Sequence, residues 1–186
     1  MYDILIVGGG PAGQSAAIFT AKAGKKTLIL DDAKGLTQRA WVRNHYGVQD
    51  AKGGDLVEEG HKQTEQFGAE VKKATVTNIV KEGDTFKAET KDGDTYEASY
   101  VILTTGANQK LAETIGLETK DGVEPYVKKV VVTDEEGRTS TKGIWAAGTA
   151  GGVSVHTIIT SGDGARVAVN LLSELKGERH VDHDSL

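Results

Sequence analysis

The sequence predicts an α/β fold with a parallel sheet and a small antiparallel β-meander. Residues 4–7 form an aliphatic run that ends in a glycine-rich segment, 8–13, and an alanine-rich stretch with helical spacing continues to residue 24. A second aliphatic run follows at 27–30. Strand, tight turn, helix and strand in this order predict two parallel strands. Short alternating segments between residues 76 and 97, separated by Gly/Asp turns, predict the meander.

The first turn carries a spacing of glycines that favours a nucleotide. Gly8, Gly10 and Gly13 match a pattern in which one glycine makes the turn, the next admits a pyrophosphate, and the third lets helix and strand pack closely. Pro11 suits the first turn of the helix, whose unpaired N–H groups and positive end then point at a phosphate. The alternative, a tight turn with a purely structural role, stays open at this point.

An acidic residue ends the second strand. Asp31 lies 18 residues after Gly13, where a carboxylate accepts hydrogen bonds from the ribose hydroxyls of a dinucleotide. Asp32 is a rival for this role. We favour Asp31 because it follows the strand directly.

The middle of the chain adds a long loop and a helix. Residues 35–54 show no periodicity, and loops of this length are uncommon without a function. A helix is predicted from Asp55 to Phe67, with Asp55 as its N-cap, and its expected role is packing. The acidic run 134–136 is expected to be a solvated turn.

Two later strands also end in small residues. An aliphatic strand at 100–103 runs into the small residues of 104–107, and the segment 143–152 shows a second junction of this kind. A helix from His156 to Leu175, closed by Gly177, follows. We expect these strand ends to gather at one edge of the parallel sheet, where ligands of α/β proteins bind.

Composition excludes several classes of protein. The chain has 186 residues, 38% hydrophobic and 26% charged, which predicts a single globular domain, 1–186. A net charge of −5 gives no attraction to nucleic acid or to acidic membranes, and no apolar run approaches a membrane span of ~18 residues. The acidic start gives no signal peptide, so a cytoplasmic location is expected. The absence of cysteine excludes disulfides and thiolate metal sites. The alternating His and acidic residues at 178–184 are expected to be exposed polar side chains that bind no metal.

Four blocks, in order, resemble the flavin-binding part of the thioredoxin reductase-like, pyridine nucleotide-disulfide oxidoreductase family. They are 8–13 with Asp31, the loop 44–47, the strand end 103–107, and the segment 139–148 followed by 157–161. The resemblance implies a Rossmann-like FAD-binding domain, with FAD as the cofactor, and it implies a homodimer. The residues that our own reading of the turn and strand assigns to the cofactor are Gly8, Gly10, Pro11, Ala12, Gly13 and Asp31. The residues that the resemblance adds are Asn44, Thr105, Gly106, Gly148, Thr149, Thr157 and Ile158.

The chain departs from the family pattern in three places. Only residues 108–130 lie between the two later blocks, too few for a nicotinamide-binding βαβ unit of about 30 residues. The family's Cys-x-x-Cys pair is absent, since the chain has no cysteine. Thr149 stands where the family has an aspartate on a ribityl hydroxyl, and losing a charge-assisted hydrogen bond costs about 1–3 kcal/mol, or about 10- to 100-fold in affinity.

These features predict a minimal FAD-dependent oxidoreductase without the nicotinamide domain and without dithiol chemistry. Its electron donor would be free NAD(P)H or a separate redox protein. The alternative is a non-catalytic dinucleotide-binding protein, a sensor or a partner subunit, and direct binding of NAD at 8–13 is a third reading. No catalytic residue is assigned. His45, Tyr46 and His156 are candidates by placement alone.

Overall fold

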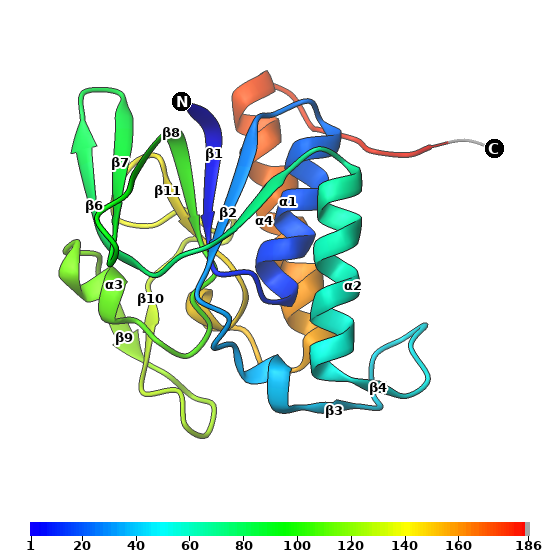
Figure 1. The fold of residues 1–186 in the computed structure, drawn as a ribbon. Helices are drawn as coiled ribbons and strands as arrows, with labels where there is room; N and C mark the ends of the chain where they lie inside the picture. The colour runs from blue at the N-terminus through cyan, green and yellow to red at the C-terminus, as the bar shows by residue number, and fades with distance from the viewer. Residues whose placement is uncertain (185–186) are drawn as a thin grey trace.

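One sheet organises the chain (Figure 1). The computed structural model describes residues 1–184, and its main sheet has the order β5-β2-β1-β8-β7-β6, with β11 also paired to β8. Neighbouring strands in the series β5-β2-β1-β8-β11 are parallel, whereas β7 pairs antiparallel with β8, and β6 pairs antiparallel with β7. The strands are β1 (Tyr2–Val7), β2 (Thr27–Asp31), β5 (Glu70–Lys73), β6 (Val76–Glu82), β7 (Thr85–Thr90), β8 (Thr95–Leu103) and β11 (Ile144–Ala146). The predicted parallel sheet and its meander are confirmed.

Strand β8 is longer than the predicted strand at 100–103. Its first half pairs with β7, and its second half pairs with β1 on one side and with β11 on the other. The alternating pattern that we assigned to the meander therefore continues directly into the aliphatic run. One strand thus joins the antiparallel and the parallel parts of the sheet.

Both faces of the parallel strands are covered. The helices α1 (Pro11–Lys22), α2 (Gly53–Gln66) and α4 (Thr157–Lys176) lie on one face, and α3 (Lys110–Thr114) and the meander lie towards the other (Figure 1). Alternate side chains of β1 take part in two separate core clusters: Ile4 and Ile6 lie in the cluster of α1 and α4, Leu5 and Val7 in that of the meander and α3. Burial on both faces explains why these strands are continuous aliphatic runs.

The remaining elements are short. The predicted loop 35–54 contains one turn of 3-10 helix, η1 (Leu36–Arg39), and a two-stranded ribbon of β3 (Trp41–Val42) and β4 (Ala51–Lys52). Strands β9 (Thr119–Asp121) and β10 (Lys129–Val131) pair antiparallel, and η2 (Gly148–Gly151) follows β11. No helix among the described residues has the length and apolar character that crossing a membrane requires.

One predicted cap is wrong. Asp55 lies inside the first turn of α2, and Lys52 is the N-cap residue without a side-chain hydrogen bond. The helix starts earlier because the Gly53 N–H donates to the Ala40 carbonyl at 2.9 Å, which ties its first turn to the preceding loop. Pro11 is the first residue of α1 and Gly177 closes α4, as predicted, although α4 begins and ends one residue later than the predicted helix 156–175.

Tyr2, on the first strand, gives a prediction about alkaline stability. Burial raises the pKa of its phenol to about 12, and the hydrogen bond to Glu70, at 2.8 Å, adds to the shift. Because this pKa lies above the ordinary value of 10.0, the phenol's contribution to stability is present below pH ~10 and is lost as pH rises towards 12. We expect Tyr2→Phe to remove this part of the alkaline stability loss. Denaturant unfolding of both proteins between pH 9 and 12 measures this loss. The prediction would be contradicted if the free energy of unfolding fell equally with pH in both proteins.

Candidate functional site

The carboxyl ends of the parallel strands open into one cavity of about 850 Å³. Its wall includes the residues at or just beyond the ends of β1, β2, β8 and β11, namely Gly8, Asp31, Thr104 and Ala147. This volume falls within the range of about 300–1,000 Å³ that is typical of cofactor sites. The predicted gathering of strand ends at one edge of the sheet is confirmed.

The glycine loop forms one wall of the cavity. A Cβ atom on Gly13 would lie 1.9 Å from the Gly8 carbonyl oxygen, so only glycine lets α1 pack this closely against the turn. A Cβ on Gly10 would meet nothing within 4 Å, and Gly10 faces the cavity. Helix α1 begins there without a side-chain cap or an acidic residue in its first turn, so its N–H groups and positive end are left for an anion.

Asp31 stands opposite this loop. The residue is 9% exposed and lines the cavity, and its Oδ1 accepts the Gly9 N–H at 2.9 Å. Asp32 also lines the cavity, but its carboxylate accepts the Lys34 N–H at 3.1 Å and lies 3.6 Å from the Lys34 ammonium. The loop itself orients Asp31, whereas Asp32 is engaged by its own local turn.

The predicted strand end 103–107 holds the glycine loop from the other side. The Thr104 hydroxyl lies 3.0 Å from the Val7 carbonyl and 2.8 Å from that of Gly8. Thr105 and Gly106 line the cavity next to it, and the buried Gln109 braces them by donating to the Gly106 carbonyl at 2.7 Å. Thr104 and Gln109 were absent from the predicted site. The contacts of Thr104 depend on the pairing of β8 with the distant β1, whereas those of Gln109 are local and carry no motif.

The late motif contributes threonines to a further part of the wall, next to the start of α1. Thr149 and Thr157 are each 7% exposed, and both line the cavity. The hydroxyl of Thr157, the first residue of α4, lies 3.1 Å from Nδ1 of His45, so the loop 44–47 reaches the start of this helix. Tyr46 is 92% exposed, and His156 is exposed next to the helix start.

The structure thus separates the predicted cofactor residues into three groups. Those that line the cavity are Gly8, Gly10, Pro11, Ala12, Asp31, Thr105, Gly106, Thr149 and Thr157. Gly13 and Gly148 lie in the wall behind it, each in close contact with backbone or a neighbouring side chain. Asn44 and Ile158 are exposed and are not among the lining residues. Additional lining residues are contributed by η1, by 74–77 and by α3.

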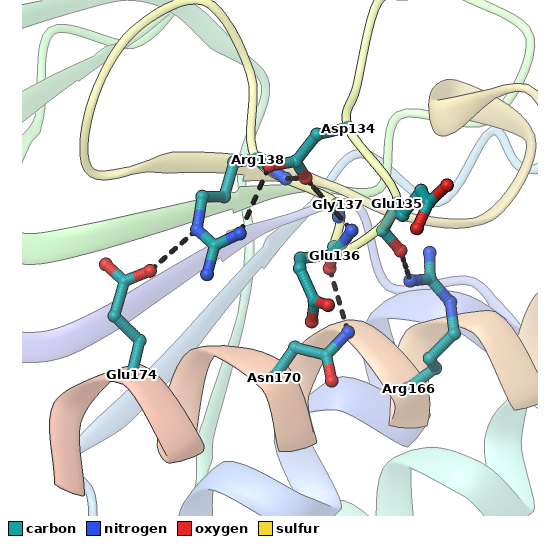
Figure 2. Close-up of polar contacts among 8 residues, drawn as sticks. All are labelled: Asp134, Glu135, Glu136, Gly137, Arg138, Arg166, Asn170 and Glu174. Carbon is teal, nitrogen blue, oxygen red and sulfur yellow. Dashed lines mark hydrogen bonds and ion pairs between the residues drawn. The ribbon is translucent and has the colours of Figure 1, made fainter. Parts of the chain in front are cut away.

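A polar cluster fastens the turn 134–138 to α4 (Figure 2). Asp134 accepts backbone N–H groups of residues 136–138 at 2.9–3.0 Å. Arg138 donates to Glu174 on α4 at 2.7 Å, and Asn170 donates to the Glu136 carbonyl at 3.1 Å. The acidic run 134–136 is exposed, as expected of a solvated turn, and its backbone carbonyls also dock it on the helix whose first residue lines the cavity.

Comparison with known proteins identifies the family. Residues 3–42 match the model of an FAD binding domain, and residues 55–162, more than half of the chain, match the model described as pyridine nucleotide-disulphide oxidoreductase. The chain belongs to this family. It is an FAD-binding member, and its cofactor is FAD. Most of the predicted loop, residues 43–54, lies between the two matches, since the first ends at residue 42 and the second begins at residue 55.

The similar proteins are thioredoxin reductases. That of Aquifex aeolicus is 36% identical over 124 residues, which cover 63% of this chain and 38% of the relative. That of Peptoclostridium litorale is 40% identical over 118 residues, 60% of this chain and 36% of the relative. This chain therefore aligns with well under half the length of these curated relatives.

Solved structures share the fold. A thioredoxin reductase from Gloeobacter violaceus superposes with a TM-score of 0.83 at 19% identity, covering 100% of this chain and 99% of that one. The enzyme of T. acidophilum gives 0.75 at 21% identity, covering 94% and 99%. Within residues 1–184 of this family member, no group of three or more His, Cys, Asp or Glu side chains is placed to hold a metal ion.

Proposed function

We propose that residues 1–186 form a single FAD-binding domain that works as a minimal flavin oxidoreductase with a separate electron donor and acceptor. The observation that carries this proposal is the cavity at the carboxyl ends of the parallel strands, with an uncapped helix start and a buried carboxylate in its wall. Its volume, its backbone donors and its acid fit a dinucleotide.

The residues divide naturally between the two halves of FAD. Free N–H groups at the start of α1 would hold the pyrophosphate, and Asp31 would accept a ribose hydroxyl. Thr149 and Thr157 would face the ribityl chain and the flavin ring, with the positive end of α4 nearby. When bound, FAD supplies hydride and electron transfer, and the protein supplies position and electrostatics. The same proposal includes residues that shape or flank the site of the flavin half, namely Asn44, Gly106, Gly148 and Ile158.

The electron donor is proposed to be free NAD(P)H or a separate redox protein. The segment between β8 and β10 contains only α3 and β9, which is too little for a βαβ nucleotide-binding unit. The chain also contributes no thiol for dithiol chemistry. A homodimer and a cytoplasmic location stay predictions from the sequence.

The visible spectrum of the purified protein tests the proposal. We expect a yellow protein with a flavin spectrum that bleaches when it is mixed anaerobically with NADH or NADPH, or with a reduced redox protein. A colourless protein that takes up no added FAD would refute flavin binding. A yellow protein that none of these donors reduces would instead support the alternative of a non-catalytic FAD-binding sensor or partner subunit.

A pair of variants distinguishes the two neighbouring acids. Asp31→Asn keeps one acceptor for the Gly9 N–H but loses the charged acceptor for the ribose, so we expect FAD to bind about 10-fold more weakly. Asp32→Asn is the matched control and should change FAD affinity by less than about twofold, because its carboxylate serves the Lys34 turn. Calorimetric titration of the apoprotein with FAD measures both. The reverse order of effects would assign the ribose contact to Asp32.

A further inference from the structure

The Gly148 peptide lies where the sheet ends and the cofactor wall begins. The Ala147 N–H still donates to Leu103 of β8 at 3.0 Å, but the next N–H, of Gly148, points away from that ladder. Gly148 has φ +68, and a Cβ there would lie 2.7 Å from the Cβ of Ala12. Its neighbours Ala147 and Thr149 both line the cavity. The direction of this one peptide therefore decides how the wall presents Thr149.

A buried carboxylate receives this N–H. Asp163, in the second turn of α4, is 8% exposed, and its Oδ2 accepts the Gly148 N–H at 2.7 Å. A buried N–H needs a partner, and a charged acceptor makes a stronger hydrogen bond than a neutral one. Asp163 itself is not among the residues that line the cavity. It acts on the site through the backbone.

The other carboxylate oxygen of Asp163 is held by an arginine. Arg166 approaches Oδ1 with Nε at 2.9 Å and with Nη2 at 2.8 Å, which neutralises the buried charge and fixes its orientation. The Nη1 of Arg166 donates to the Glu135 carbonyl, so the same side chain is tied to the turn 134–138 (Figure 2). The side chains of Asp163 and Arg166 thereby connect α4, the turn 134–138 and the cavity wall at Gly148.

We propose that Asp163 is a positioning residue for the flavin half of FAD: locked by Arg166, it fixes the Gly148 peptide and so holds Thr149 towards the ribityl chain. This inference rests on the proposed function, which places the flavin half at Thr149 and Thr157. The ADP half would be held by the N–H groups of α1 and by Asp31, with which Asp163 forms no hydrogen bond in residues 1–184. Asp163 should therefore govern the affinity for FAD and leave the affinity for ADP unchanged.

Asp163→Asn tests this with little change of shape. A carboxamide has one acceptor oxygen where the carboxylate has two, so it cannot satisfy both the Gly148 N–H and Arg166. We expect apoprotein of this variant to bind FAD about 10-fold or more weakly and ADP within about twofold of wild type, by calorimetric titration. Equal weakening of FAD and ADP, or no weakening of either, would overturn the proposal.

Glu174→Gln is the matched control. It removes a carboxylate–arginine pair from the same helix and the same turn, but it does not touch the Gly148 peptide. We expect both affinities of this variant to stay within about twofold of wild type. A loss of FAD affinity equal to that of Asp163→Asn would mean that general docking of the turn, and not the Gly148 contact, governs the site.

Amide hydrogen exchange of Gly148, followed by NMR in the apoprotein, gives a readout without cofactor. The Gly148 N–H should exchange slowly in wild type and in Glu174→Gln and faster in Asp163→Asn. Unchanged slow exchange would contradict the proposal. If Asp163→Asn does not fold, Arg166→Met keeps the carboxylate but frees it, and a selective loss of FAD affinity is again expected. Wild-type protein that binds no FAD would refute the proposed function, while Gly148 exchange would still test the Asp163 contact.

Discussion

Replacing Gly13 with alanine is expected to lower the free energy of unfolding by about 3 kcal/mol or more and to abolish FAD binding. The new Cβ would lie 1.9 Å from the Gly8 carbonyl oxygen and 2.8 Å from the Thr104 hydroxyl, so the turn or the helix must move. Overpacking against backbone belongs to the few mechanisms that give large losses of stability. Denaturant unfolding and the FAD content of the purified variant measure the two effects.

Gly162→Ala is the matched control for this change. Gly162 lies on the exposed side of α4, and a Cβ there would meet nothing within 4 Å. Alanine is favoured over glycine inside a helix by up to about 1 kcal/mol, so this variant should be as stable as wild type or slightly more stable. Wild-type stability and FAD content in Gly13→Ala would show that the turn has room that the structure does not show.

Replacing Gly10 with valine is expected to separate binding from folding. Gly10 has φ −77 and ψ −174, which valine adopts readily, and a Cβ there would meet no protein atom within 4 Å. The free energy of unfolding of the apoprotein should stay within about 0.5 kcal/mol of wild type. FAD should bind about 100-fold more weakly or worse, because the side chain occupies the space in front of the α1 N–H groups.

The series is measured by calorimetric titration with FAD and by denaturant unfolding of the apoprotein. Gly10→Ala should fall between wild type and valine, since its side chain fills less of the same space. FAD binding to Gly10→Val with wild-type affinity would show that the pyrophosphate does not approach the loop here. The glycine spacing would then have only the structural role that the sequence left open.

The part of the site that the first 31 residues form could be predicted because its geometry is local. Strand, glycine turn, helix and Asp31 follow one another within 31 residues, and each residue type has a direct physical reason at its position. The structure adds the contact that the spacing does not contain, the hydrogen bond from the Gly9 N–H to Asp31. The pairing of β1 with β2 brings the glycine loop and Asp31 together, and it needs no other part of the chain.

The rest of the cavity depends on long-range placement. The segment 74–77 reaches it because β5 pairs with β2 and the Ala74 N–H donates to the Asp31 carbonyl at 2.9 Å, and nothing in the local sequence signals this. Asn44 and Ile158 were assigned by position in a motif, yet both are exposed outside the cavity wall. No sequence pattern indicates Asp163, because it acts through the backbone N–H of a distant residue.

The order of pairing in the sheet also bears on how the site arises during synthesis. β1 can pair with β8 only after β8, about a hundred residues later in the chain, has been synthesised. The carboxyl edge of the parallel sheet is complete only when β11 and α4, which follow residue 143, are also present. Such non-local pairing gives a high contact order and slow folding. The glycine loop is synthesised first and Thr149 and Thr157 much later, so the pocket is complete only after residue 157 has been added to the chain. FAD can therefore contact both walls of the pocket only after residues about 150 positions beyond the glycine loop have been synthesised and packed.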